Sequence, residues 1–341
     1  MKAKLINGMS PSGKRNMLGE MLPLDTPYLV QIFPVYGCNF KCGYCLHGLP
    51  LSEHGFISNS GYMRFDTYKK IIDNLKYFNK KIKMLRFAGI GEPLLHKDID
   101  KMISYAKKKK IADNIELVTN GLLLDYNLSK KLISSGLDKL RISIQGVTAK
   151  KYLELCKTKI DYDNFLSELE WLYNSKGNMQ IYIKIIDCAL ENETDESSFY
   201  KMFGDKSDFI AIEHMTPTVQ GIDYVGLSKE NVTELGQNGS ELLDSNICPQ
   251  PFYLIQVNPD GNVVPCCSTQ YPIILGNVNN TDLKAIWDSA RANQFRTDML
   301  EGVKFASKVC SKCNLYQYGL FKEDRLDEYS NILKEKYKWA K

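Results

Sequence analysis

Three cysteines lie close together near the start of the chain, at Cys38, Cys42 and Cys45, in the pattern C-x3-C-x2-C. Three thiolates can hold three irons of a cubane [4Fe–4S] cluster and leave the fourth iron open. An open iron can bind the amino and carboxylate groups of a methionine moiety, and a reduced cluster can then break a sulfonium C–S bond. A structural zinc site is the alternative, but zinc prefers four ligands in paired C-x2-C spacing, and His47 would crowd the loop as the fourth.

A glycine-rich segment, FAGIGEPLLH, follows the second expected strand and includes Gly89, Gly91, Glu92 and Pro93. Glycines allow the backbone to approach a ligand closely and to expose its carbonyl groups. In isolation the segment is also compatible with an ordinary strand-to-helix turn. Its position one strand after the cysteine triplet favours a role in the same site.

The cysteine triplet and the glycine-rich segment resemble the radical S-adenosylmethionine (SAM) superfamily, as does the aromatic Tyr44 before the third cysteine. The VTNG segment over 118–121 is also similar to that family. The resemblance implies an enzyme that reductively cleaves SAM and begins radical chemistry. It further implies that Tyr44 packs against the adenine and that Gly89, Gly91 and Glu92 bind SAM.

The fourth expected strand, RISIQG, alternates Arg141, Ser143 and Gln145 with two isoleucines. A period of two places the polar side chains on one face, which should line the lumen of a barrel whose helices lie outside. Family resemblance implies that Ser143 contacts the SAM ribose or carboxylate. Arg141 and Gln145 are candidates for contact with the substrate, and many relatives carry Asp at the position of Gln145.

The fifth expected strand places Lys184 and Cys188 on one face. A buried lysine needs a polar surrounding, so Lys184 is a candidate for the SAM carboxylate or ribose, and a lysine at the outer edge that reaches water is the alternative. Cys188 is either a hydrogen donor to a substrate radical or a small buried hydrophobe. On the sixth strand Glu213 or His214 faces inward as a candidate catalytic residue, and periodicity does not decide between them.

A second set of cysteines follows the strand-and-helix region: Cys248, Cys266 and the C-x2-C pair Cys310 and Cys313. With the turn at Gly261, the set resembles the SPASM/Twitch extension of radical SAM enzymes. No cysteine follows Cys313, which favours the short Twitch form. Four thiolates would then hold one auxiliary [4Fe–4S] cluster. Four cysteines ending in C-x2-C also suit zinc, but the neighbouring radical SAM motifs favour iron and sulfide.

The composition indicates a folded protein of balanced charge, because 44% of its 341 residues are hydrophobic and its formal net charge is +4. This charge gives no reason to expect a nucleic-acid partner. No segment approaches the ~20 apolar residues that span a bilayer, and the N-terminal segment lacks the apolar core of a signal peptide. We therefore expect a cytoplasmic protein without a membrane partner, whose ten cysteines serve metal binding rather than disulfides. Cys156 and Cys267 are expected to fill buried space.

Apolar strand patterns alternate with helical patterns of period 3.6. The expected strands cover residues 29–36, 83–88, 114–119, 139–144, 180–188 and 209–215. This alternation predicts a parallel sheet, either a partial barrel or a doubly wound sheet, with ligands at the carboxyl ends of the strands. With the resemblance, we expect an α/β fold: a partial (β/α)6 TIM barrel with a small C-terminal Twitch-type iron–sulfur module.

The same patterns divide the chain into four segments. They are an N-terminal extension over 1–25, a radical SAM partial barrel over 26–235, a Twitch/SPASM-like domain over 236–321 and a C-terminal helix over 322–341. Within them we expect Asp66 to cap a helix, residues 258–261 to form a turn, and residues 283–296 to form one helix.

The resemblance implies two [4Fe–4S] clusters, SAM, a small-molecule substrate and an electron donor such as flavodoxin or ferredoxin. A single, fully ligated auxiliary cluster resembles 2-deoxy-scyllo-inosamine dehydrogenase-type enzymes and favours oxidation of an alcohol in a sugar or aminocyclitol. Epimerisation, with Cys188 or Cys267 as hydrogen donor, is the first alternative. Peptide modification is the second, although about 25 residues before the first strand are too few for a leader-binding domain.

Overall fold

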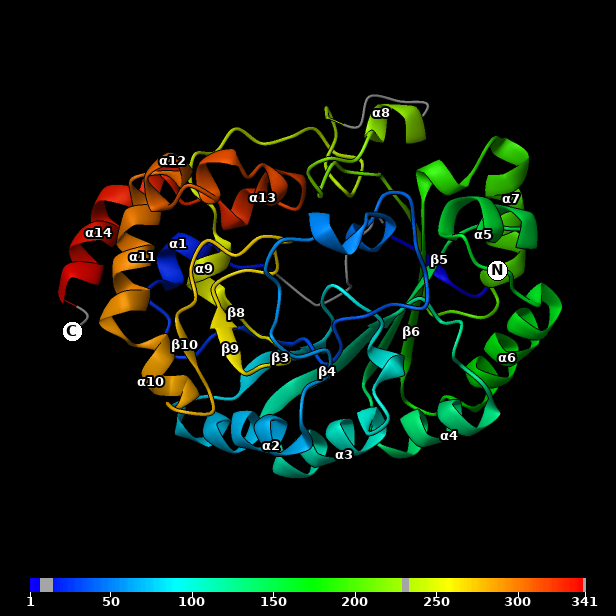
Figure 1. Ribbon diagram of the computed structural model, residues 1–341, viewed down its shortest axis with the longest axis horizontal. Coiled ribbons are helices and arrows are strands. Elements are labelled where there is room, and N and C mark those ends of the chain that lie inside the picture. Colours follow the sequence, from blue (N-terminus) through cyan, green and yellow to red (C-terminus); the bar gives the residue numbers. More distant parts are fainter. Residues whose placement is uncertain (7–14, 229–232, 340–341) are drawn as a thin grey trace.

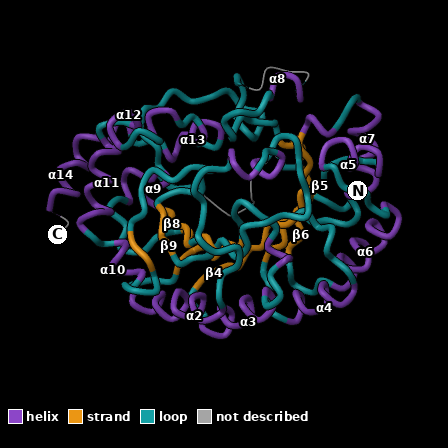
Figure 2. Tube along the Cα trace, viewed as in Figure 1, coloured by secondary structure: helices purple, strands orange, loops and turns teal. Residues whose placement is uncertain are grey.

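The computed structural model describes residues 1–6, 15–228 and 233–339. Within these ranges, ten strands form one sheet in the order β1-β7-β6-β5-β4-β3-β2-β8-β9-β10 (Figures 1 and 2). The strands are β1 (Lys4–Leu5), β2 (Leu29–Ile32), β3 (Ile82–Phe87), β4 (Ala112–Thr119), β5 (Lys139–Ile144), β6 (Gln180–Ile186), β7 (Phe209–Glu213), β8 (Leu254–Val257), β9 (Asn262–Val264) and β10 (Gly276–Asn277). The sheet is curved and does not close on itself.

Strands β2 to β7 are parallel and lie side by side in chain order. The helices between them cover the outer face of the curved sheet (Figure 1). They are α2 (Phe65–Asn74), α3 (Ile99–Lys109), α4 (Tyr126–Ser134), α5 (Ala149–Cys156), α6 (Tyr162–Ser175) and α7 (Glu193–Phe203). This arrangement confirms the prediction of a partial (β/α)6 barrel.

Alternation along β5 follows the sequence pattern. Leu140, Ile142 and Ile144 are fully buried, whereas Arg141 and Ser143 are only half-buried. The apolar side chains belong to the main hydrophobic core beneath the outer helices. Burial of an aliphatic side chain contributes about 1.5–3 kcal/mol, so the two faces of the strand cannot exchange without a large loss of stability.

Several element ends differ from the sequence prediction. Strand β2 stops at Ile32, shortly before Pro34, which has no amide hydrogen to donate. Strand β6 stops at Ile186, because a 3-10 turn over Asp187–Ala189 follows. Helix α2 begins at Phe65, so Asp66 lies in its first turn and does not cap it.

The C-terminal part joins the barrel through the sheet itself. Strand β8 pairs in parallel with β2, and the side chains of Gln31 and Gln256 are hydrogen bonded across this pair at 2.6 Å. Strands β8 and β9 are antiparallel, and the predicted turn between them is confirmed by a hydrogen bond from Gly261 N to Asn258 O at 2.9 Å. The sequence did not predict that this module extends the barrel sheet.

Seven further helices follow β7 in the described part of the chain. They are α8 (Tyr224–Leu227), α9 (Gln250–Tyr253), α10 (Leu283–Trp287), α11 (Ala290–Leu300), α12 (Val303–Ala306), α13 (Leu315–Tyr318) and α14 (Ser330–Trp339). The prediction of a single helix over 283–296 is wrong, because the helix is interrupted after Trp287. The side chain of Ser289 accepts a hydrogen bond from Ala292 N and caps the start of α11. The α-helix expected over 322–341 begins only at Ser330, after two 3-10 turns, and residues 340–341 lie outside the described part.

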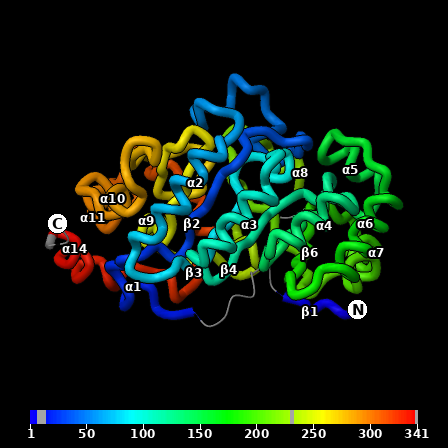
Figure 3. Tube along the Cα trace, turned by 90° about the horizontal axis from the view of Figure 1, so that it is seen from below, coloured from blue at the N-terminus to red at the C-terminus, as the bar shows by residue number. Residues whose placement is uncertain are grey.

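The N-terminal segment also contacts the body of the protein. Strand β1 pairs with β7 at the sheet edge opposite β10, and β1 and α14 lie at opposite ends of the molecule (Figure 3). Helix α1 (Leu18–Met21) adds Leu18 to a second hydrophobic core, which also contains Phe252 and Leu333. Among the described residues, no helix has the length and apolar character needed to cross a membrane.

Candidate active site

The first three cysteines lie in the loop that leaves β2 at the carboxyl end of the barrel strands. Cys42 is buried, and Cys38 and Cys45 are half-buried. The amide of Phe40 donates to Cys38 Sγ at 3.4 Å, and Asn120 Nδ2 lies 3.9 Å from the same sulfur. Burial raises the pKa of Cys38 to about 12 and that of Cys45 to about 11. A metal must therefore displace protons from these thiols in order to bind.

The glycine-rich segment packs directly against this loop. A Cβ atom on Gly91 would lie 2.1 Å from Val35 O and 2.7 Å from Gly37 O. The neighbouring amide of Glu92 donates to Gly37 O at 2.8 Å. Gly91 is thus required for close approach of two segments of this chain, in addition to any approach to a ligand.

Glu92 joins the glycine-rich segment to the VTNG segment. Its Oε1 accepts from Leu94 N at 2.8 Å and from Thr119 Oγ1 at 2.7 Å, and its Oε2 accepts from Asn120 N at 2.8 Å. Both carboxylate oxygens are therefore engaged within the protein. The predicted contribution of Glu92 to SAM binding would accordingly be made through its backbone and through the loops that it holds.

The carboxyl group of Glu92 is expected to make stability depend on pH. Burial raises the pKa of Glu92 to about 7, despite its hydrogen bonds. Between the unfolded value of about 4.3 and this folded value, only the folded state holds the proton, so the group's contribution to stability falls as pH rises. Glu92→Gln should remove this pH dependence. Its free energy of unfolding should therefore rise relative to that of wild type by up to about 3 kcal/mol as the pH goes from 4 to 8.

The measurement is denaturant unfolding of wild type and Glu92→Gln across that pH range, with the exposed Glu53→Gln as matched control. A difference between wild type and Glu92→Gln that stays constant with pH would contradict the assignment.

An ion-pair network joins three neighbouring strands of the barrel, β3, β4 and β5. Arg86 Nε lies 2.5 Å from Glu116 Oε1, and Arg141 Nη2 lies 3.4 Å from Glu116 Oε2. Burial acts to raise the pKa of Glu116, but the charges of Arg86 and Arg141 outweigh it and lower the pKa to about 2. The sequence prediction that Arg141 faces the lumen is in agreement with this placement. Arg86 and Glu116 were missed, although each is a charged residue with an apolar residue on either side of it in its strand.

A second network lies between β6 and β7. Lys184 pairs with Glu213 Oε2, which also accepts from Gln237 Nε2 at 2.6 Å. Tyr182 donates to Glu213 Oε1 at 3.0 Å. Glu213 is therefore the residue of the sixth strand that shares the lumen face with Lys184. Gln237, from a loop with no sequence pattern, was not predicted.

Polar side chains on β5 connect to the cysteine loop. Tyr44 donates its hydroxyl hydrogen to Gln145 Oε1, and Gln145 Nε2 donates to Ser143 O at 3.1 Å. Ser143 lies beside Lys184 in the register of β5 and β6. The structure thus brings four of the predicted site residues together at one end of the barrel.

Cys188 does not lie on the strand face that the sequence analysis assigned to it. It belongs to the 3-10 turn over Asp187–Ala189, where the amide of Cys188 donates to Asp187 Oδ1 at 2.7 Å. His214 Nδ1 lies 2.6 Å from Asp187 Oδ2. Cys188 packs nonetheless near Tyr44 and Tyr224, which keeps it close to the cysteine loop.

The second cysteine set converges on one small cavity. Cys248, Cys266, Cys310 and Cys313 all line it, together with apolar side chains such as Phe295 and Met299. Burial raises the pKa of Cys248, Cys266 and Cys310. The structure therefore unites the four residues that the sequence predicted as ligands of an auxiliary cluster.

The seven cysteines of the two sets are free thiols in the structure. In the part of the chain that the structure describes, no three His, Cys, Asp or Glu side chains are placed to hold a single metal ion. A zinc ion would need its thiolates about 2.3 Å from the metal. Four thiols that line one cavity are the donor set of a [4Fe–4S] cluster.

The two remaining cysteines differ from each other. Cys156 is fully buried, as predicted, but it also contacts a residue of the first set, with Cys156 Sγ 3.5 Å from Cys42 Sγ. Cys267 is exposed, so its predicted role as buried filler is wrong. It lies beyond the end of β9 at Val264, and its amide donates to Gln250 Oε1 at 3.3 Å.

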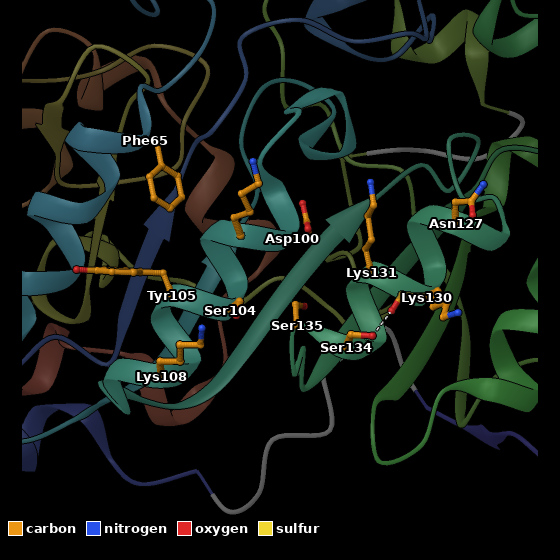
Figure 4. A pocket seen from close by; sticks show the side chains of 11 residues that line it. Phe65, Asp100, Ser104, Tyr105, Lys108, Asn127, Lys130, Lys131, Ser134 and Ser135 are labelled. Atoms are coloured by element: carbon orange, nitrogen blue, oxygen red, sulfur yellow. Dashed lines mark hydrogen bonds between the residues drawn. The ribbon is translucent and has the colours of Figure 1, made fainter.

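A cavity of about 840 Å³ lies away from both cysteine sets, between α3 and α4 on the outer surface (Figure 4). Lysines and serines line it, among them Lys108, Lys131 and Ser104. No predicted site residue reaches it, and we assign it no role in the chemistry.

Two protein-family models match the regions that contain the two cysteine sets. Residues 32–197 match the Radical SAM superfamily, and residues 248–314 match the SPASM iron–sulfur cluster-binding domain. The first range contains the cysteine triplet and the second contains all four C-terminal cysteines. The chain belongs to the radical SAM superfamily. It is a radical SAM enzyme of the SPASM type, and its cofactors are SAM and two [4Fe–4S] clusters.

Curated relatives of this radical SAM enzyme include GTP 3',8-cyclases. The probable GTP 3',8-cyclase of Methanococcus maripaludis is 35% identical over 118 residues, which are 35% of this chain and 36% of that protein. The GTP 3',8-cyclase of Staphylococcus saprophyticus is 29% identical over 173 residues, 50% of this chain and 48% of that protein. The chain thus spans between about a third and a half of the length of these relatives.

Solved structures share the fold. BtrN in complex with AdoMet and 2-DOIA has a TM-score of 0.54 at 19% identity, over 86% of this chain and 97% of that one. Streptococcus suis SuiB bound to precursor peptide SuiA has a TM-score of 0.60 at 17% identity, over 82% and 69%. The enzyme anSMEcpe with bound AdoMet has a TM-score of 0.59 at 18% identity, over 91% and 96%. At these identities the similarity establishes the fold alone.

Proposed function

We propose that this radical SAM enzyme oxidises an alcohol group of a small hydroxylated molecule, a sugar or an aminocyclitol, to a ketone. The observation that carries the proposal is the convergence of Cys248, Cys266, Cys310 and Cys313 on one cavity. Four protein thiolates satisfy all four irons of a cluster, so such a cluster cannot bind substrate. It is suited to accept the electron that the substrate radical releases when its hydroxyl group loses a proton to solvent.

When bound, SAM and the first cluster supply the 5′-deoxyadenosyl radical that removes a hydrogen atom from the substrate. Cys38, Cys42 and Cys45 would hold that cluster. Tyr44, held in place by its hydrogen bond to Gln145, would pack against the adenine of SAM. Lys184, paired with Glu213, would contact the SAM carboxylate or ribose.

Epimerisation is the second candidate, and the placement of Cys188 favours it. Burial raises the pKa of Cys188 to about 12, so the sulfur keeps its hydrogen at neutral pH. Cys188 also packs near Tyr44, beside the cysteine loop. A thiol in that position could return a hydrogen atom to a substrate radical. Replacement of Cys188 by alanine would leave a dehydrogenase competent but would stop an epimerase.

The proteins similar to this chain are named with different ligands or reactions. BtrN was crystallised with AdoMet and 2-DOIA, SuiB with a precursor peptide, and the curated relatives are named for a cyclisation of GTP. We favour the small hydroxylated molecule because one cavity collects all four C-terminal cysteines. We further propose a cytoplasmic location and an electron donor such as flavodoxin or ferredoxin.

The test is anaerobic reconstitution followed by assay of 5′-deoxyadenosine, alone and with aminocyclitols, sugars, GTP and SuiA-like peptides. A dehydrogenase yields one ketone per 5′-deoxyadenosine. An epimerase incorporates solvent deuterium without net oxidation. Stimulation by GTP or by peptide alone would reject the proposal.

Loss of the auxiliary cluster is expected to separate the two stages of the reaction. Cys310→Ala with Cys313→Ala should lower the iron content from about eight to about four atoms per chain. SAM cleavage should continue while formation of oxidised product stops, because the electron acceptor is lost. Ser311→Ala, an exposed position between the two cysteines, is the matched control. Normal product formation by the double variant would contradict an electron-accepting role.

A further inference from the structure

The C-terminal end of helix α5 is attached to the loop of the first cysteine set. The amide of Lys41 donates to Cys156 O at 2.9 Å, and the amide of Gly43 donates to Leu155 O at 2.9 Å. These two bonds lie on either side of Cys42. The last residues of α5 therefore fix the backbone that carries one of the predicted cluster ligands.

The same helix end brings a second sulfur to Cys42. Cys156 Sγ lies 3.5 Å from Cys42 Sγ, and Cys156 is fully buried. Between free thiols either sulfur can donate. Once Cys42 binds iron as a thiolate it has no hydrogen, so only Cys156 can donate across this contact.

We propose that Cys156 donates an S–H···S hydrogen bond to the Cys42 thiolate and thereby raises the reduction potential of the SAM-binding cluster. Hydrogen bonds to the sulfurs are one of the established determinants of cluster potential. The reduced cluster carries one more negative charge than the oxidised one, and a donor stabilises the more negative state. Cys156 is thus a positioning residue that acts through Cys42.

The position of the helix end gives this hydrogen bond a particular role. The C-terminus of a helix carries partial negative charge, and α5 directs that end at the cysteine loop. This field opposes the addition of an electron to a nearby cluster. A donor from the same helix end offsets the unfavourable field. The proposal concerns the first cluster only and is independent of which substrate the enzyme uses.

A purely structural role makes a different prediction. If Cys156 only fills space, alanine and serine should act alike, or serine should be worse because it buries a hydroxyl. If Cys156 donates to Cys42, serine retains a donor and alanine does not. Comparison of Cys156→Ala with Cys156→Ser therefore separates the two roles.

The experiment is a potentiometric titration of the reconstituted full-length protein, followed by electron paramagnetic resonance. Adding SAM identifies the signal of the cluster with the open iron. We expect the midpoint of Cys156→Ala to lie below that of wild type and the midpoint of Cys156→Ser to lie near it. In D₂O, wild type should show a deuteron coupling to the reduced cluster that Cys156→Ala lacks. Leu153→Ala, at an exposed position of the same helix, is the control.

Iron content shows whether each variant has folded and loaded its clusters. Equal midpoints for wild type and Cys156→Ala would overturn the proposal, as would equal shifts in the alanine and serine variants. Failure of both variants to bind iron would show a structural role and would also overturn it.

Discussion

Replacing Cys38, Cys42 and Cys45 together by alanine is expected to abolish SAM cleavage. No thiolates would remain to hold the cluster with an open iron, so the site that binds the methionine moiety would be lost. Iron should fall from about eight to about four atoms per chain, because the auxiliary cluster keeps its own ligands. Iron, sulfide and 5′-deoxyadenosine measured after anaerobic reconstitution under a strong reductant test this expectation.

Phe305→Ala serves as the control for this triple variant, since Phe305 is exposed and belongs to neither cysteine set. It should retain about eight irons and the wild-type rate of SAM cleavage. Residual SAM cleavage by the triple variant, or zinc as the metal of the wild-type protein, would contradict the assignment of these three cysteines.

Glu116→Gln is expected to lower the free energy of unfolding by about 3–5 kcal/mol, the usual effect of breaking a buried ion pair. The carboxylate of Glu116 is almost fully buried and faces both Arg86 and Arg141. Its removal leaves two guanidinium groups close together without the carboxylate between them. Denaturant unfolding followed by circular dichroism measures the loss. Glu154→Gln, which removes an exposed pair with Lys150, should change stability by less than about 0.5 kcal/mol.

The pH dependence of this effect has a defined sign. Burial acts to raise the pKa of Glu116, but the two arginines outweigh it and lower the pKa to about 2. The unfolded value is about 4.3, so the stabilisation is present above that pH and is lost as pH falls towards 2. The difference between wild type and Glu116→Gln should therefore shrink on acidification from pH 5. A difference that does not change with acid would show that the ion pairs contribute little.

The parts of the fold predicted correctly depend on local signals. Alternation along residues 139–144 placed Arg141 and Ser143 on the half-buried face of β5, because a period of two is a property of the strand itself. Cysteine spacing identified two sets of thiols, and the four of the second set do meet at one cavity. Such patterns depend only on residues close together in the chain, so the sequence alone reveals them.

The parts that could not be predicted depend on contacts between distant residues. The pairing of β2 with β8 joins segments more than two hundred positions apart, and no local pattern specifies it. Strand β6 ends before Cys188 because the Asp187 side chain binds the amides of Cys188 and Met215. Such side-chain bonds to the backbone compete with the strand ladder. The hydrogen bond between Gln237 and Glu213 likewise joins separate segments, so only the folded structure reveals it.

The parallel pairing of β2 with β8 also determines whether the barrel and the iron–sulfur module can be produced as separate proteins. Strand β2 leads into the first cysteine loop, and β8 lies between the second cysteine set's first two members in the chain. A truncated protein ending before residue 248 would expose the amides and carbonyls of β2 along an open edge. Exposed edges of this kind recruit strands from other molecules. The iron–sulfur module is therefore not detachable, and exchange of modules between relatives would have to carry β2 with it.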